Sequence, residues 1–176
     1  SRSAVYSQKV DTIYSNGLIY SIDTNKFFFH DIFDFDYYSK YFQFESLELY
    51  SYDSLANFRN AQFFSKANFA LTRFKSSANF RNARFDSLAN FRNAQFDSLA
   101  NFRNARFVSF ADFNISHFFS SANFRNARFD SLVDFAYSRF DSLANFRNAQ
   151  FFSEVNFRDT RFFSNVNFRN ARFDSL

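Results

Sequence analysis

The sequence predicts an all-β protein, a four-sided parallel β-solenoid with about 22 residues in each coil. The first observation behind this prediction is the spacing of Phe from Phe58 to Phe173, where the gaps alternate between five and six residues without interruption. The second is a small residue, Ala, Ser, Thr or Val, two positions before nearly every one of these Phe. The third is the composition of the repeats, since Asn, Ser, Asp and Phe are poor helix formers.

The side positions distinguish this full period from one half as long. In one set of repeats the residue after Phe is always Arg: Arg59, Arg81, Arg103, Arg125, Arg147 and Arg169. In the set shifted by half a period, the same position holds Ala70, Arg92, Asn114, Ala136 and Arg158. Because the columns are uniform at the full period and irregular at the half period, we expect a coil with sides of five, six, five and six residues.

Stacked coils give this pattern a core. A flat five-residue segment cannot bury its own Phe, but identical segments stacked about 4.8 Å apart close a continuous core and pair the backbone groups. We expect four inward Phe columns, with the small residue two positions earlier also facing inward. A helix fits poorly, because Phe at steps of five and six would form two stripes about 140° apart.

The corners must be turned without the usual residues. Gly occurs once and Pro not at all, although all-β proteins normally rely on both in turns. We expect Asn, Ser and Asp at the corners to take their place, because these residues tolerate unusual backbone angles. The Asn columns that begin at Asn57 and Asn60 are interpreted as amide ladders that support the stack.

The units Ala56-Asn57-Phe58-Arg59-Asn60 and Ala144-Asn145-Phe146-Arg147-Asn148 carry a resemblance to a known family. They resemble the pentapeptide-repeat family, whose unit is Ala-(Asp/Asn)-Leu/Phe-x-x. The resemblance covers residues 41–176 and implies a right-handed four-sided β-helix. The chain departs from the family pattern in that every second unit has a sixth residue, as at Leu55, Lys66 and Ser77. Whether these sixth residues face in or out is left open.

Residues 1–40 do not repeat and are predicted to form a separate N-terminal cap or arm. Thr12-Ile13-Tyr14 and Leu18-Ile19-Tyr20, with Ser15-Asn16-Gly17 between them, indicate a hairpin. A cap would cover the first coil, whereas an arm would dock on another subunit. Counting back one period from Phe63, Phe69 and Phe74 places Tyr41, Leu47 and Tyr52 in inward columns. We therefore assign residues 41–176 to the solenoid, roughly six coils long.

Two surface features are candidates for binding. The arginine ladder, defined as Arg59, Arg81, Arg103, Arg125, Arg147 and Arg169, is either a solvated face with its charges splayed or paired with acids, or a site for an anion. That anion would be the Asp column of a neighbouring rod, an acidic polysaccharide or phosphates. Nucleic acid is disfavoured, because the net charge is only +4 and acids are interleaved with the basic residues.

Apolar residues also stand where the repeat should face outward. They either tuck into wide corners or form a stripe for association. The candidate assembly contacts are Phe110, Phe119, Phe152, Phe163, Phe173 and Leu176. The chain given stops on an ordinary repeat, so we expect its last coil to be covered by further chain or by the next subunit, which would give a head-to-tail filament.

Residues for chemistry are scarce. The chain has no Cys and two His, and it lacks clustered metal ligands and a Gly-rich phosphate loop. We expect no catalysis, no cofactor and no metal, and no apolar run is long enough for a transmembrane helix. Asn114-Ile115-Ser116 matches a glycosylation acceptor. An extracellular or cell-surface location is weakly favoured, with the cytoplasm left open.

The function expected from the sequence is therefore structural, with self-assembly into a filament or sheath. The alternative is a discrete protein-interaction module. The family resemblance implies one such role, since some members resemble duplex DNA and bind DNA gyrase. That mimicry needs an acidic rod, and the basic balance of this chain disfavours it.

Overall fold

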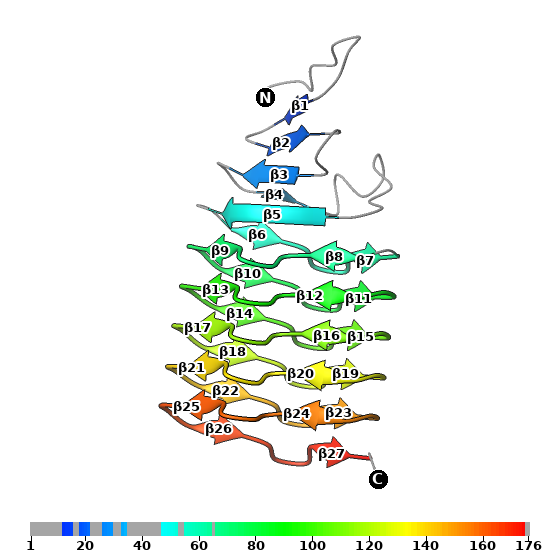
Figure 1. Cartoon of the computed structure of the whole chain (residues 1–176), viewed down its shortest axis with the longest axis vertical. Helices are drawn as coiled ribbons and strands as arrows, with labels where there is room; N and C mark the ends of the chain where they lie inside the picture. Colours follow the sequence, from blue (N-terminus) through cyan, green and yellow to red (C-terminus); the bar gives the residue numbers. More distant parts are fainter. Residues whose placement is uncertain are drawn as a thin grey trace.

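The computed structural model describes the backbone of five N-terminal strands and, in full, residues 55–64 and 66–174. The described residues contain strands, turns and bends and no helix. Between residues 55 and 174 the chain forms about five coils of a parallel β-solenoid, stacked in one direction from β6 to β27 (Figure 1). The all-β class and the solenoid architecture expected from the sequence are confirmed.

Each coil contributes one short strand to each of four columns. The first column contains β6 (Ala56–Asn57), β10 (Ala78–Asn79), β14 (Ala100–Asn101), β18 (Ala122–Asn123), β22 (Ala144–Asn145) and β26 (Val166–Asn167). The second contains β7 (Gln62–Phe63), β11 (Arg84–Phe85), β15 (Arg106–Phe107), β19 (Arg128–Phe129), β23 (Gln150–Phe151) and β27 (Arg172–Phe173). The third contains β8 (Ala67–Asn68), β12 (Ala89–Asn90), β16 (Ala111–Asp112), β20 (Val133–Asp134) and β24 (Val155–Asn156). The fourth contains β9 (Arg73–Phe74), β13 (Gln95–Phe96), β17 (His117–Phe118), β21 (Arg139–Phe140) and β25 (Arg161–Phe162).

The register between coils settles the period. Ala78 pairs with Ala56 on one side and with Ala100 on the other, in parallel. Likewise Phe85 pairs with Phe63 and Phe107. These partners are one predicted period apart in the sequence, so identical positions of the repeat lie directly above one another. The full period is confirmed, and among the described coils no strand pairs with a partner half a period away.

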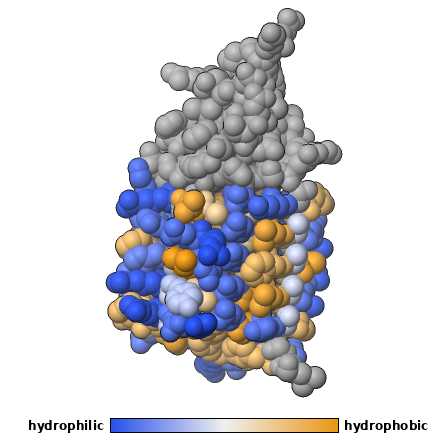
Figure 2. All heavy atoms as spheres, viewed as in Figure 1, coloured by the Kyte–Doolittle hydropathy of each residue, from blue (hydrophilic) through white to orange (hydrophobic). Residues whose placement is uncertain are grey.

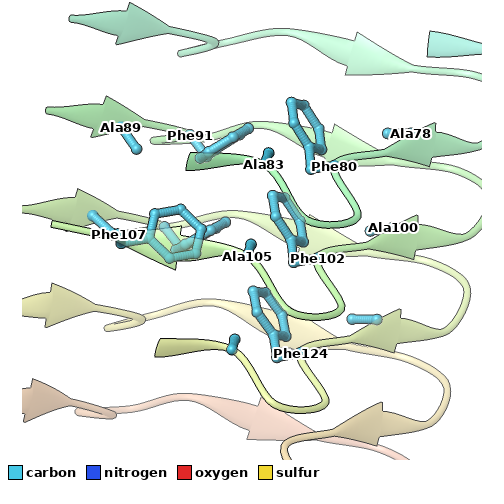
Figure 3. Close-up of a cluster of buried hydrophobic side chains, with 14 of the residues drawn as sticks. Ala78, Phe80, Ala83, Ala89, Phe91, Ala100, Phe102, Ala105, Phe107 and Phe124 are labelled. Atoms are coloured by element: carbon cyan, nitrogen blue, oxygen red, sulfur yellow. The ribbon is translucent and has the colours of Figure 1, made fainter. Parts of the chain in front are cut away.

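Columns of Phe fill the interior. Phe80, Phe102 and Phe124 lie one above the other (Figure 3), with ring centroids 4.8 and 4.9 Å apart and interplanar angles of 0° and 2°. Since carbon atoms touch at about 3.5–4.0 Å, parallel rings at this spacing must slide sideways, which is the favoured offset arrangement. Phe91 in the facing column meets Phe80 edge to face at 5.3 Å and 86°. Each ring is thus stacked along its own column and edge-on to the next.

The small residues make room for these rings. Ala100 and Ala105 precede Phe102 and Phe107 by two positions, and all four are fully buried. The same holds for the polar members of the small-residue columns, Thr72, Ser116 and Ser138. The expectation that both the Phe and the small residue face inward is confirmed. In the last coil the burial falls, and Phe168 is only partly buried.

Two kinds of corner alternate around each coil. After Phe80, the N–H of Ala83 donates to the Phe80 carbonyl at 3.0 Å, and Asn82 has a φ of 59°. This is the pattern of a type II turn, whose third residue needs a positive φ and so favours Gly or Asn. The six-residue side instead bends without such a bond, as between Phe85 and Ala89. The expected substitution of Asn for Gly is confirmed at the tight corners.

Tight corners occur twice in each coil, and not all of them carry Asn. The third turn residue has a positive φ throughout: Asn60, Leu71, Asn82, Asn93, Asn104, Ile115, Asn126, Tyr137, Asn148, Asp159 and Asn170. Leu71, Ile115 and Tyr137 are bulky residues for this region, and Ile115 is also β-branched. One of the two tight corners of each coil is therefore uniformly Asn, while the other is mixed.

The N-terminal strands precede the regular stack. β1 (Thr12–Ser15) and β2 (Leu18–Ser21) pair antiparallel with Ser15 opposite Leu18, which confirms the pairing of the predicted hairpin. β3 (Lys26–Phe29) pairs antiparallel with β2 and parallel with β5 (Leu47–Tyr52). β4 (Phe33–Asp34) pairs parallel with β6. The division into residues 1–40 and 41–176 remains a prediction.

The regular register begins within β5. Tyr52 pairs with Phe74, as counting back one period predicts, but Leu47 pairs with Ala67 instead of lying under Phe69. The expected position of Leu47 was therefore wrong by two positions. The physical reason is that β5 is one continuous strand that pairs with both β8 and β9, so it has no corner between these two columns. Tyr41 lies outside the described residues.

Candidate functional site

The arginine ladder occupies the uniform tight corner, one rung per coil. Each Arg is the second residue of a type II turn, held by the Asn two positions earlier, whose Oδ1 accepts the Arg backbone N–H. These bonds measure 3.2 Å from Arg81 to Asn79 and 3.1 Å from Arg103 to Asn101. The same bond recurs at Arg59, Arg125, Arg147 and Arg169. The local sequence Asn-Phe-Arg-Asn therefore fixes the direction of every rung.

No member of the ladder forms an ion pair within the described coils. Its four inner members, Arg81, Arg103, Arg125 and Arg147, are half-buried, and their Nε atoms are buried without a hydrogen-bond partner there. The sequence left open whether these arginines pair with acids around a corner. They do not, so the cationic charge of the corner is uncompensated among the described residues.

Four of the acids, Asp86, Asp97, Asp130 and Asp141, are instead engaged by other cations, on the sides of the coil. Arg106 lies 2.7 Å from Asp130, which stands one coil and two positions further along, and Arg73 lies 2.9 Å from Asp97 in the same relation. His117 reaches Asp141 at 2.8 Å by the same step. Each pair joins one coil to the next and occupies a carboxylate away from the ladder.

The aromatic candidates occupy the position taken by Asp in these pairs. Arg128 lies over the ring of Phe152 at 4.1 Å, and Arg139 lies over Phe163 at 4.3 Å, again one coil and two positions further along. Phe119 stacks on His117 at 3.5 Å between ring centroids. A ring beneath a cation replaces an ion pair with a cation–π contact. The sequence did not predict this use of outward Phe, although the constant step between basic and aromatic positions could have indicated it.

These rings are still accessible. Phe119, Phe152 and Phe163 are exposed by 43, 39 and 57%, and Phe173 by 49%. Phe110, at a sixth position, is half-buried. Side chains at the sixth position are therefore buried to different degrees, since Leu88 and Leu132 are half-buried, whereas Leu99 and Leu143 are exposed. Leu176 lies outside the described residues, and an assembly role for the others remains a proposal.

Hydrophilic and hydrophobic side chains run in columns along the stack (Figure 2). This follows from the register, which places each repeat position above its counterpart. The described coils, residues 55–174 apart from Ser65, hold 17 Lys and Arg and 9 Asp and Glu, giving a net charge of +8. Residues 1–54 hold 4 basic and 8 acidic residues, giving −4. The chain is therefore more polarised in charge than its total of +4 suggests.

The pKa values of three carboxyl groups reflect these contacts. Burial acts to raise the pKa of Asp130, but the hydrogen bonds and charges of Arg128 and Arg106 outweigh it and hold the pKa below its ordinary value. Burial and the contacts of Arg139 and His117 act in the same opposed way on Asp141, whose pKa is also lowered. Burial raises the pKa of Asp112, which has no basic hydrogen-bond partner among the described residues.

The glycosylation match is placed where the folded coil does not expose it. Asn114 of the glycosylation match is only 9% exposed, and its Nδ2 donates to Asp134 at 3.2 Å. Ser116 of the same match is fully buried, so the folded coil does not present this acceptor.

Within the described residues no group of three or more acidic or His side chains is arranged as a metal site. No helix among them is long and apolar enough to cross a membrane.

A coil with four short parallel strand columns, stacked Phe and Asn at type II corners defines the class of four-sided β-solenoid repeat proteins. A family model described as pentapeptide repeats, with nine copies, matches residues 58–106. Residues 58–106 therefore carry pentapeptide repeats, and the same pattern of Phe spacing continues to Phe173. Comparisons with curated proteins and with solved structures gave no match.

Proposed function

We propose that this protein is a non-enzymatic structural solenoid whose copies associate end to end into a filament or sheath. The observation that carries the proposal is the stacking itself, in which successive coils share one register and one set of Phe columns. Phe157, Phe162 and Phe168 pack on the core but are only partly buried, and Phe173 is exposed by 49%. The proposal is that a second copy continues this stack in the same register.

The backbone of the edge supports the same pairing. In the preceding coil, the N–H groups of Ala144, Phe146 and Asn148 donate to the next coil at 2.8–3.1 Å. Continued stacking in a second copy would use the same N–H to carbonyl pairing. An edge with ordered donors over an aromatic layer is a template for strand addition. A contact that is not closed by symmetry produces a filament.

Charge favours a polar, head-to-tail arrangement. The described coils carry +8 and residues 1–54 carry −4. The acidic N-terminal segment of one copy would attract the basic coils of another, whereas two basic stacks would repel each other. The proposal therefore predicts polymers that weaken as salt is raised, since exposed charges farther apart than about 8–10 Å are largely screened at physiological ionic strength.

A pair of matched variants tests the proposal. Phe173→Glu places a charge on the edge of the last described coil, and Phe163→Glu places the same charge on a similarly exposed ring at the side. We expect sedimentation and negative-stain imaging to show filaments for the unmodified chain and for Phe163→Glu, and short particles for Phe173→Glu. A monodisperse monomer at high protein concentration would refute the proposal, and loss of filaments in Phe163→Glu alone would indicate lateral association instead.

The alternative role, a DNA mimic that binds a topoisomerase, has less support. Such a mimic needs a column of negative charge, and the described coils are net positive with an unpaired arginine ladder. A supercoiling assay with excess protein tests this directly. Inhibition of supercoiling would overturn the preference for a structural role.

A further inference from the structure

The two tight corners of each coil are the same turn, yet only one of them is uniform. In both, an N–H donates back to the Phe carbonyl, at 3.0 Å from Ala83 and from Ala94, and the third residue has a positive φ. At the mixed corner the two turn residues vary freely, for example Ala70-Leu71 and Asn114-Ile115. At the uniform corner they are Arg-Asn in every described coil. The turn itself does not require Arg at this position. We therefore look for the reason for the uniform Arg in what its side chain does on the outward surface.

The uniform corner offers hydrogen-bond donors in two parallel lines. One line is the arginine ladder, which has no acid partner among the described residues. Beside it the third turn residues form an amide ladder, in which each Asn Nδ2 donates to Oδ1 of the preceding coil. The bonds run from Asn82 to Asn60, Asn104 to Asn82, Asn126 to Asn104, Asn148 to Asn126 and Asn170 to Asn148, at 2.9–3.3 Å.

The amide ladder is not saturated by these bonds. An Asn side chain has two N–H donors and two acceptor lone pairs, and each inner Asn uses one of each within the ladder. Asn82, Asn104 and Asn126 are exposed, so the second donor and acceptor face solvent. Such a line suits hydroxyl groups, which both donate and accept. The neighbouring guanidinium groups suit carboxylates, which their planar fork binds through two bonds.

The geometry of the corner limits what can lie along it. Successive coils are 4.8–4.9 Å apart at the stacked rings and nearly without rotation, with interplanar angles of 0–2° at the centre. Five such intervals of 4.8 Å separate the six rungs, so the ladder is straight and about 24 Å long. Over that length a strand of duplex DNA advances about seven base pairs and winds about two-thirds of a turn. A duplex would therefore touch only part of the ladder.

The acids of another copy are also a poor fit. Among the described residues, the column that begins with Asp86 is interrupted by Val108 and Phe152, and Asp86 and Asp130 already pair with arginines. A flexible linear polymer with one carboxylate and several hydroxyls in each unit meets both lines of the corner at once. We propose that the uniform corner binds an acidic polysaccharide, a chain of uronate sugars. This inference does not depend on end-to-end assembly.

The mixed corner supplies a matched control. Arg103→Gln with Arg125→Gln removes two central rungs, and Arg92→Gln with Arg158→Gln removes two arginines from the same turn position at the mixed corner. Both double variants lower the net charge by the same amount. Binding to polygalacturonate, neutral dextran, and single- and double-stranded DNA would be measured by calorimetry or interferometry, with circular dichroism to verify the fold and sedimentation to record the oligomeric state.

We expect polygalacturonate to bind the unmodified chain, the rung variant to bind about tenfold more weakly, and the control variant to change by less than about twofold. Affinity for oligogalacturonates should rise with length and level off near six units, the number of rungs. Equal weakening in both variants would show that binding depends only on net charge and would overturn the proposal. Equal or tighter ladder-dependent binding of DNA would assign the corner to nucleic acid, and a changed oligomeric state without loss of polygalacturonate binding would assign it to contacts between copies.

Discussion

Replacing Phe102 tests whether the aromatic columns hold the coils together. Phe102 is fully buried, stacks on Phe80 and Phe124 at 4.8 and 4.9 Å, and meets Phe91 and Phe113 edge to face at 5.3 and 5.4 Å. Phe→Ala in a core costs about 3–5 kcal/mol. Aromatic pairs contribute about 0.5–1.5 kcal/mol each beyond burial. Phe102 also meets Phe96 and Phe107 at 6.0 and 6.2 Å, so six aromatic pairs are lost, and Phe102→Ala should lower the free energy of unfolding by at least about 5 kcal/mol.

Two comparisons make this prediction specific. Phe102→Leu keeps most of the volume and should lower the free energy of unfolding by about 2 kcal/mol, mainly through the lost aromatic pairs. Phe168→Ala lies in the last described coil, where the ring is partly buried, stacks on Phe146 alone and meets three other rings at 5.8–6.5 Å, so its cost should be about 2–3 kcal/mol. Urea unfolding followed by far-ultraviolet circular dichroism measures all three. Equal costs for Phe102→Ala and Phe168→Ala would refute a shared aromatic column.

Three further predictions concern individual side chains. Ser116 Oγ is fully buried without a hydrogen-bond partner among the described residues, and Ala94 occupies the same column one coil earlier. Ser116→Ala should therefore raise the free energy of unfolding by about 1 kcal/mol in a urea titration, and a loss of stability would contradict this. Ile115 has a φ of 59°, so Ile115→Asn should raise the free energy of unfolding by about 1 kcal/mol, and the reverse change at the same corner, Asn93→Ile, should lower it by about as much. Thermal melts compare the two, and a lower melting temperature for Ile115→Asn than for Asn93→Ile would show that the corner is not strained. The pKa of Asp130 is lowered in the folded chain, so its contribution to stability is present above its unfolded pKa of about 3.9 and is lost as pH falls through the folded value. Asp130→Asn should therefore lower the free energy of unfolding at neutral pH and make that free energy fall less in acid, and an unchanged acid profile would count against the ion pairs.

The fold was accessible from the sequence because one rule governs nearly every residue of the stack. The alternating steps between Phe58 and Phe173 set both the side lengths and the core, and the uniformity of Arg81 and Arg103 against the irregularity of Ala70 and Arg92 fixed the period. Local preference and global packing agree here, as expected for a repeat in which each coil contacts only its neighbours.

The errors and omissions arose where the repeat rule does not decide. Leu47 was misplaced because β5 runs straight past the position where later coils turn, which no repeat pattern reveals. The outward Phe152 and Phe163 were expected either to tuck into wide corners or to form an association stripe, whereas Arg128 and Arg139 lie over them. The sixth positions divided between half-buried Leu88 and exposed Leu99, although both stand in the same local sequence Phe-Asp-Ser-Leu-Ala, so the residues of the bend itself do not decide the burial.

The sequence identified the residues of the candidate site but not whether their charges are paired. Repetition marked the six arginines, and the geometry then showed that their inner Nε atoms have no partner among the described residues while the acids are engaged elsewhere. Such pairing depends on a step of one coil and two positions, which follows from the coil period only once the side-chain directions are known.

Oxidative cross-linking of two introduced cysteines tests the central claim, that identical positions one full period apart lie directly above one another. The chain has no Cys of its own, so the background is zero. Arg84 and Arg106 are partners on β11 and β15, and neighbouring strands lie about 4.8 Å apart, within the Cα separation of about 4.4–6.8 Å that a disulfide spans. In dilute protein, Arg84→Cys with Arg106→Cys should form an intramolecular disulfide, whereas Arg84→Cys with Gln95→Cys, half a period apart, should not. A disulfide in the second variant and none in the first would contradict the full-period coil.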